Sequence, residues 1–181
     1  MLITLSCVFA LFLMVWIERT LCGKLAQNGY LLIIRFLFAA YMLFCLYMTL
    51  LSRTANDFHP ITLVPLSTFM RIFGLPVESW GDLFGLASGT LEGGKPNLQG
   101  VGGMIQNIVL FVPFGFLMKG GWTRLRIGRI VALGFLCSLG IEMIQLLCRL
   151  GWFDVDDILF NTTGVYLGLR LYGCDLLGYT R

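Results

Sequence analysis

Apolar residues gather in five runs along the 181-residue chain, at residues 2–17, 30–51, 104–118, 127–147 and 155–173. One bilayer crossing needs about 20 mainly apolar residues in a helix, so these runs predict membrane spans. The third run is short and contains Pro113 and Gly115, so we expect a kinked helix there, or an incomplete crossing. The first run has no basic residues ahead of it and no small-residue cleavage site after it, which favours a retained span.

The segment between the second and third runs, residues 52–103, is too long and too mixed for a simple connection. Its apolar part, Leu63 to Phe73, contains Pro65 and is about half as long as a crossing requires. An interfacial or re-entrant helix is therefore predicted here instead of a span. Residues 89–103 are rich in glycine, and we expect them to be flexible.

Composition places the chain among integral membrane proteins. Hydrophobic residues make up 57% and charged residues 13%, with a mean hydropathy of +0.84, whereas soluble domains are about 25% charged. The predicted fold is all-α, a polytopic transmembrane helix bundle of about five spans. We expect an N-terminal two-helix unit, residues 1–51, and a membrane domain, residues 52–181, whose spans cover 104–121, 127–147 and 155–173.

The net charge, the cysteines and the single histidine argue against nucleic-acid binding, a disulfide framework and a His-rich metal site. The formal net charge of +3 is spread along the chain, so nucleic acid is not expected as a partner. Of the six cysteines, Cys7, Cys45 and Cys137 lie within apolar runs, which indicates small buried hydrophobes and not disulfides. His59 is the single histidine, so a His-rich metal site is excluded. We expect neither a metal nor a cofactor.

Basic residues in the links predict the orientation of the spans. Arg19 and Lys24 lie in the first link, four basic residues lie in residues 119–129, and the link after residue 147 carries Arg149 against three aspartates. Because Lys and Arg favour the cytoplasmic side, the first and third links are predicted inside. The N-terminus and residues 52–103 would then be outside, and the C-terminus inside.

This orientation brings polar residues together near the outer leaflet, on three of the predicted spans. A carboxylate at the bilayer centre costs about 2.5–3.5 kcal/mol on the insertion scale, so a matched set of polar groups suggests a shared site. Glu142, Gln145 and Arg149 share one helix face by their spacing, as do Asp157 and Asn161. The candidate residues for a lipid or substrate pocket are Arg53, Asn107, Glu142, Gln145, Arg149, Asp156, Asp157 and Asn161.

Structural roles are open for the same residues. Asp154 and Asp157 suit the start of the last predicted helix as capping residues, and Glu142 suits an ion pair with Arg53 or Arg149. Asp156 with Asp157 offers oxygen ligands for a divalent cation, but adjacent residues point apart on a helix.

Glycine spacing predicts one helix contact. Gly164 and Gly168 lie four residues apart, so they should face a neighbouring span, and we expect residues 127–147 to be that span.

Three stretches resemble the signature blocks of the VanZ-like family of membrane proteins. These are NIVLFVPFGFL at 107–117, SLGIEMIQ at 138–145 and FDVDDILFNTTG at 153–164. LVPL at 63–66 is similar to that family's earlier N-L-x-P-F block, from which it departs at Thr62 and Leu66. The resemblance covers about residues 53–171. It implies a bacterial cell membrane and a link to glycopeptide (teicoplanin-type) antibiotic resistance, without implying a chemical mechanism.

Three classes of function are consistent with these patterns. In the first, the outer cluster binds membrane lipid, a lipid-linked cell-envelope precursor or the glycopeptide itself. In the second, Glu142 or Asp157 is a general base, and Arg53 or Arg149 holds a lipid phosphate. No serine or cysteine is paired with a histidine as an activated nucleophile, which counts against a hydrolase. The third, a structural partner protein, leaves the clustered carboxylates unexplained. We favour the first class.

Overall fold

The computed structural model describes residues 16–17, 20, 27–53, 61–75, 77, 79–87, 99–151 and 153–173. Most of the first predicted run, His59 and the residues after Gly173 lie outside these ranges. Within them the chain is an all-α bundle with one two-stranded sheet, as the apolar runs predict. The division into units 1–51 and 52–181 and the count of five spans stay predictions.

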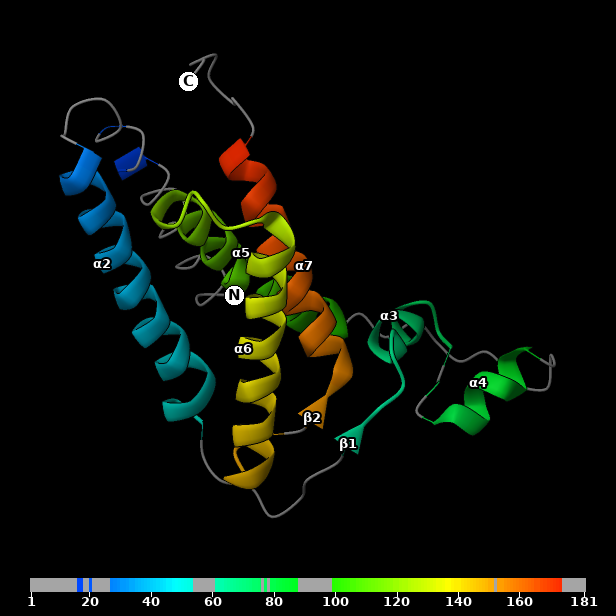
Figure 1. Cartoon of the computed structure of the whole chain (residues 1–181). Coiled ribbons are helices and arrows are strands. Elements are labelled where there is room, and N and C mark those ends of the chain that lie inside the picture. Colours follow the sequence, from blue (N-terminus) through cyan, green and yellow to red (C-terminus); the bar gives the residue numbers. More distant parts are fainter. Residues whose placement is uncertain are drawn as a thin grey trace.

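Long helices account for the bundle (Figure 1). They are α2 (Gln27–Leu46), which continues into the π-helical turn η1 (Tyr47–Leu51), α5 (Gln99–Gly121), α6 (Ile127–Leu147) and α7 (Val155–Gly173). The stretches 127–147 and 155–173 are helices with the predicted bounds, whereas the crossing of a membrane by α7 stays a prediction. Helix α2 together with η1, α5 and α6 are each long and apolar enough to cross a membrane.

Helix α5 is longer than its apolar run indicates. It begins at Gln99 and continues through Pro113 to Gly121, and residues 100–121 are long and apolar enough to cross a membrane. A complete crossing stays a prediction. Residues 100–103 are helical, which corrects the expectation that the glycine-rich stretch is flexible to its end.

Short elements between α2 and α5 lie to one side of the bundle (Figure 1). They are β1 (Ile61–Thr62), α3 (Ser67–Ile72) and α4 (Trp80–Ala87). Strand β1 pairs in parallel with β2 (Phe153–Asp154), which directly precedes α7. The short helix predicted within residues 63–73 is therefore present as α3, and its six residues are too few to cross a bilayer.

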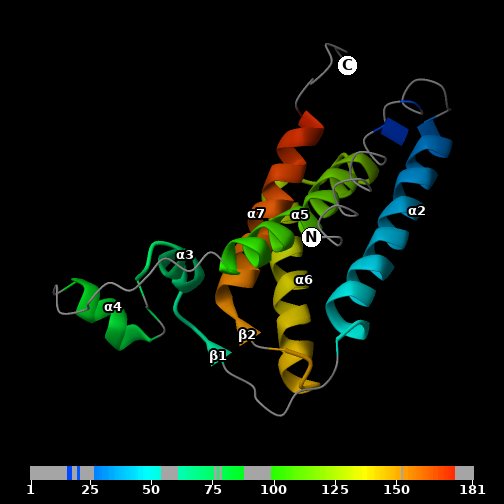
Figure 2. The ribbon, with the colours of Figure 1, turned by 180° about the vertical axis from the view of Figure 1, so that it is seen from behind.

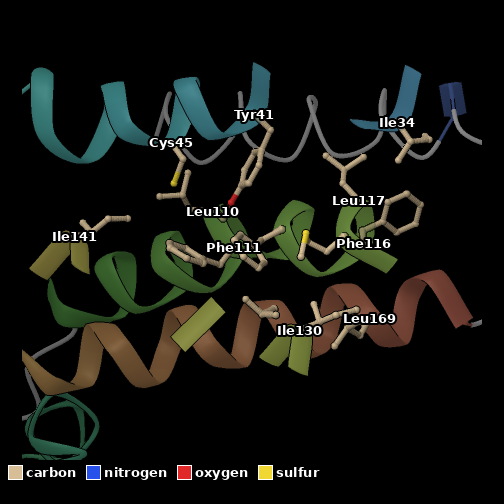
Figure 3. Close-up of a cluster of buried hydrophobic side chains, with 13 residues drawn as sticks. Ile34, Tyr41, Cys45, Leu110, Phe111, Phe116, Leu117, Ile130, Ile141 and Leu169 are labelled. Carbon is tan, nitrogen blue, oxygen red and sulfur yellow. The ribbon is translucent and has the colours of Figure 1, made fainter. Parts of the chain in front are cut away.

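The hydrophobic core lies between α2, α5, α6 and α7 (Figure 3). Phe111 and Leu117 of α5 are fully buried, as are Ile34 of α2 and Ile130 of α6. The hydroxyl of Tyr41 donates to the Leu110 carbonyl at 2.9 Å, which joins α2 to α5. Cys45 belongs to this core and the partly buried Cys137 packs against it, as predicted for small hydrophobic side chains.

Glycines allow α5 and α7 to pack in close contact as parallel neighbours. A Cβ atom built on Gly164 would lie 2.1 Å from the Ile108 carbonyl oxygen, and one on Gly168 would lie 2.0 Å from that of Val112. Gly115 of α5 meets the Val165 carbonyl oxygen in the same way, at 2.0 Å. The predicted close contact is present, but its partner is α5 and not α6. The spacing of residues along a helix shows which of them share a face, but it does not identify the helix that packs against that face.

Candidate functional site

The start of α7 carries three aspartates, and each serves a different neighbour. Strand β2 ends at Asp154, whose Oδ1 accepts a hydrogen bond from the Asp156 N–H at 2.9 Å. That geometry is an N-cap, with Val155 as the first helical residue and Asp156 as the second. The capping role considered for Asp154 is therefore present. Burial raises the pKa of the Asp154 carboxyl, while the hydrogen bond from Asp156 and the positive charge of Arg71 oppose this shift.

Asp156 holds α3 against the bundle. It is fully buried, and its carboxylate accepts hydrogen bonds from the Leu66 N–H, from the Thr68 N–H at 2.7 Å and from the Ser67 hydroxyl at 3.3 Å. These donors belong to the start of α3, where backbone N–H groups lack partners within the helix. Leu66 has a left-handed backbone with φ of 63°. Asp156 thus serves as an N-terminal cap supplied from a distant part of the chain.

Asp157 faces α5, where Oδ1 accepts a hydrogen bond from the Asn107 side-chain amide. Glu142 of α6 approaches the same region from the other side, and its Oε2 accepts from the Asp154 N–H at 3.1 Å. Asn107, Glu142 and Asp157, predicted to share a site, are thus brought together at the start of α7. Among the described residues, no ion pair joins Glu142 to Arg53 or Arg149. The Glu142 carboxylate is instead hydrogen-bonded to the backbone of Asp154.

A cavity of about 200 Å³ opens between α3, the first turns of α5 and the start of α7. Figure 2 shows these three elements beside one another. Asp154, Asp157 and Arg71 supply the charged groups of its wall, and the described lining residues are completed by Thr68, Gly100, Gly103, Met104 and Phe160. The cavity therefore combines two carboxylates, one guanidinium and an apolar side. No three His, Cys, Asp or Glu side chains of the described chain converge as metal ligands would.

Two further arginines were predicted at the site, and the structure separates them. Arg53 follows η1 and is not among the residues that line the cavity. Gly151 leaves space for its guanidinium, because a Cβ atom there would lie 2.6 Å from Nη1. Arg149 lies beyond the end of α6 with a left-handed backbone, φ of 60°, and is exposed. The helix face predicted for Glu142, Gln145 and Arg149 therefore stops before Arg149.

Gln145 and Asn161 are buried but serve helix contacts outside the cavity. The Gln145 amide donates to the Thr49 carbonyl at 2.8 Å, one of the carbonyls at the end of η1 that lack a helical partner. The Asn161 amide donates to the Ser138 hydroxyl of α6 at 2.8 Å. Asp157 and Asn161 thus bond to different helices, although their spacing predicts a shared face.

Sequence reasoning missed Thr68 and Arg71 as members of the site. The Arg71 guanidinium donates to the Thr68 hydroxyl at 3.2 Å, and both residues line the cavity. The signal in the sequence was a polar Thr and an Arg within the apolar stretch 63–73. Their place in the cavity wall depends on the hydrogen bonds between Asp156 and α3.

Comparisons with known proteins agree with the resemblance in the signature blocks. A family model described as VanZ/LLP1 matches residues 36–177 of the chain. The chain is 37% identical over 70 residues to Protein VanZ of Enterococcus faecium. That stretch is 39% of this chain and 44% of the relative, so the match spans less than half of the relative's length. No solved structure matches the chain.

Proposed function

Because the chain belongs to the VanZ/LLP1 family, we propose that it acts in glycopeptide (teicoplanin-type) antibiotic resistance at the bacterial cell membrane. Its action would be to bind a cell-envelope lipid or lipid-linked precursor in the cavity between α3, α5 and α7. The observation that carries this proposal is the cavity itself, which places Asp154, Asp157 and Arg71 beside the apolar side chains of Met104 and Phe160. Polar and apolar walls together suit an amphiphile.

Exposed aromatic side chains on α3 and α4 support a ligand from the membrane. Phe69 and Phe73 of α3 pack against each other with ring centroids 5.0 Å apart, yet remain 46% and 64% exposed. Trp80 and Phe84 of α4 are also exposed. Tryptophan concentrates where lipid tails meet head groups, and exposed Phe side chains of interfacial helices enter the acyl boundary, so we propose that α3 and α4 lie in the membrane interface.

Charge at the two ends of the bundle supports the predicted orientation. Arg124 and Arg126 are exposed between α5 and α6, and Arg129 is exposed in the first turn of α6. The carboxylates lie at the other ends of these helices, around Asn107 and Glu142. Since basic links favour the cytoplasm, the cavity would open toward the outer leaflet, with the N-terminus outside and the C-terminus inside.

Cysteine labelling in intact cells tests this orientation. In a variant that lacks the six native cysteines, Ser52→Cys should react with an impermeant thiol reagent, and Thr123→Cys should react only after lysis. Both positions are exposed and lie at opposite ends of the long helices. Labelling of Thr123→Cys in intact cells, with Ser52→Cys protected, would reverse the orientation and move the cavity to the inner leaflet.

The catalytic alternative has less support from the geometry. Glu142 is one of the two candidate bases. One of its carboxylate oxygens accepts a hydrogen bond from the Asp154 N–H, and the residue does not line the cavity. Asp157 does line the cavity and remains the residue on which binding or catalysis would depend. Substitution of Asp157 therefore addresses both functions.

We expect Asp157→Asn to abolish resistance while the protein stays folded and inserted. The asparagine can still accept from the Asn107 amide, so the contact with α5 is kept while the charge in the cavity is lost. If Asp157 acted only through the helix dipole, the cost would be at most about 1 kcal/mol of stability, with function retained. The measurement is teicoplanin susceptibility of a strain that expresses each variant at matched membrane abundance.

Controls separate loss of the site from loss of the protein. Arg124→Gln removes an exposed charge between α5 and α6 and should keep wild-type resistance. Glu142→Gln should reduce resistance, and the double variant with Asp157→Asn should be no worse than the more severe single variant, because both act on one unit. Wild-type resistance in both single variants would refute the binding role of the cavity.

A further inference from the structure

The cavity wall carries both negative and positive groups, Asp154, Asp157 and Arg71, so a ligand with both charges fits it best. We propose that it binds the head group of a zwitterionic phospholipid that carries a primary ammonium and a phosphodiester, as phosphatidylethanolamine does. This inference rests on the binding site of the proposed function and assigns its ligand. Asp154 and Asp157 would hold the ammonium, and Arg71 would hold the phosphate.

Size limits the ligand to a head group. Pockets that enclose drug-sized molecules measure about 300–1,000 Å³, whereas this cavity has about 200 Å³. A whole glycopeptide or a disaccharide-peptide precursor exceeds this space. A small polar head fits, and its acyl chains would leave along the apolar side formed by Met104 and Phe160.

Charge excludes a purely anionic head group. The cavity wall carries two carboxylates and one guanidinium, so a second anionic group would meet like charge. An ammonium has three N–H donors, which match the oxygens of Asp154 and Asp157. The guanidinium of Arg71 can bind two phosphate oxygens at once, and its bond to the Thr68 hydroxyl holds it in place.

The phosphate side of the cavity includes the first turn of α5. Gly100 and Gly103 line the cavity there, and no atom lies within 4 Å of where a Cβ of Gly103 would be. Thr68 fills the space beside Gly100, where a Cβ atom would lie 3.0 Å from Cγ2. The open space beside Gly103 lets a phosphate approach the backbone N–H groups near the start of a 23-residue helix. Such N–H groups favour an anion, so they add to the charge of Arg71.

Binding of two short-chain lipids tests the assignment. The purified full chain in detergent is titrated with dihexanoyl phosphatidylethanolamine or dihexanoyl phosphatidylglycerol, and binding is followed by tryptophan fluorescence. We expect the ethanolamine lipid to bind at least about tenfold more tightly, which corresponds to about 1.4 kcal/mol. Asp157→Asn should abolish most of this preference, Arg71→Gln should weaken the binding of both lipids, and Arg124→Gln should match the wild type.

Two results would overturn the assignment. They are equal or tighter binding of phosphatidylglycerol by the wild type, and an unchanged preference in an Asp157→Asn protein whose thermal unfolding matches the wild type. The resistance assay separates this inference from the proposed function. Loss of resistance in Asp157→Asn without any wild-type lipid preference leaves the function and refutes the ligand. Normal resistance in Asp157→Asn together with a lost preference refutes the function and leaves the ligand.

Discussion

Replacement of Gly168 by leucine is expected to lower the free energy of unfolding by at least about 3 kcal/mol, the upper range for overpacking. A Cβ atom at this position would lie 2.0 Å from the Val112 carbonyl oxygen and 2.9 Å from the Phe116 backbone nitrogen. Both atoms belong to the backbone of α5, so no rotation of a side chain relieves the clash. The two helices must separate, and the buried contacts of Val165 and Leu169 with the core are weakened as a result.

A matched control distinguishes this clash from the general effect of leucine in a helix. Gly140 lies inside α6, and nothing lies within 4 Å of the position of its Cβ atom. Gly140→Leu should therefore leave stability unchanged or raise it, because leucine has the higher helix propensity. Thermal unfolding of both purified variants in the same detergent provides the measurement. Equal melting temperatures for Gly168→Leu and Gly140→Leu would contradict the close contact between α5 and α7.

Asp156→Asn is expected to release α3 from the bundle, at a cost of about 2–3 kcal/mol for the lost hydrogen bonds to a buried carboxylate. The carboxylate accepts from Leu66, Ser67 and Thr68 with both oxygens. Asparagine retains one carbonyl oxygen, and its amide group would face an N–H donor in place of the second oxygen. One backbone donor at the start of α3 would then lack a partner.

Hydrogen exchange locates this effect in the chain. The backbone amides of Leu66 and Thr68 should exchange faster in Asp156→Asn, whereas those of the α6 core should keep their protection. Asp157→Asn is the matched control, since the neighbouring aspartate faces Asn107 and makes no hydrogen bond to α3 in the described structure. Unchanged protection of Leu66 and Thr68 in Asp156→Asn would show that Asp156 does not hold α3.

These two expectations share a physical origin in the organisation of α7. Its glycines set the distance to α5, and residues 154–157, which end β2 and begin α7, bind α3, α5 and α6 through separate groups. The cavity exists because these contacts hold α3 beside the first turns of α5. A change at Asp156 is therefore expected to alter the cavity indirectly, while a change at Asp157 removes a charge from its wall.

The sequence by itself determined the helical class, the bounds of α6 and α7, and the family. The length of an apolar run and the identity of the residues that end it are local properties, so they could be read without knowledge of neighbouring helices. The signature blocks from Asn107 to Gly164 are likewise continuous stretches. The same reasoning placed Asn107, Glu142 and Asp157 at one level of the bundle. There the structure joins Asn107 to Asp157, and Glu142 accepts from the N–H of nearby Asp154.

Only the tertiary structure decided which helix each polar residue and each glycine of α7 contacts. Residues three or four apart share a helix face, but the helix that packs on that face depends on the complementarity of whole surfaces. For that reason Gly168 faces α5 and not α6, and Asn161 bonds to Ser138 and not to the group around Asp157. Arg71 reaches the cavity because Asp156, 85 positions later by the sequence numbering, holds α3 there. Such a contact between distant segments is formed by folding and has no local signal in the chain.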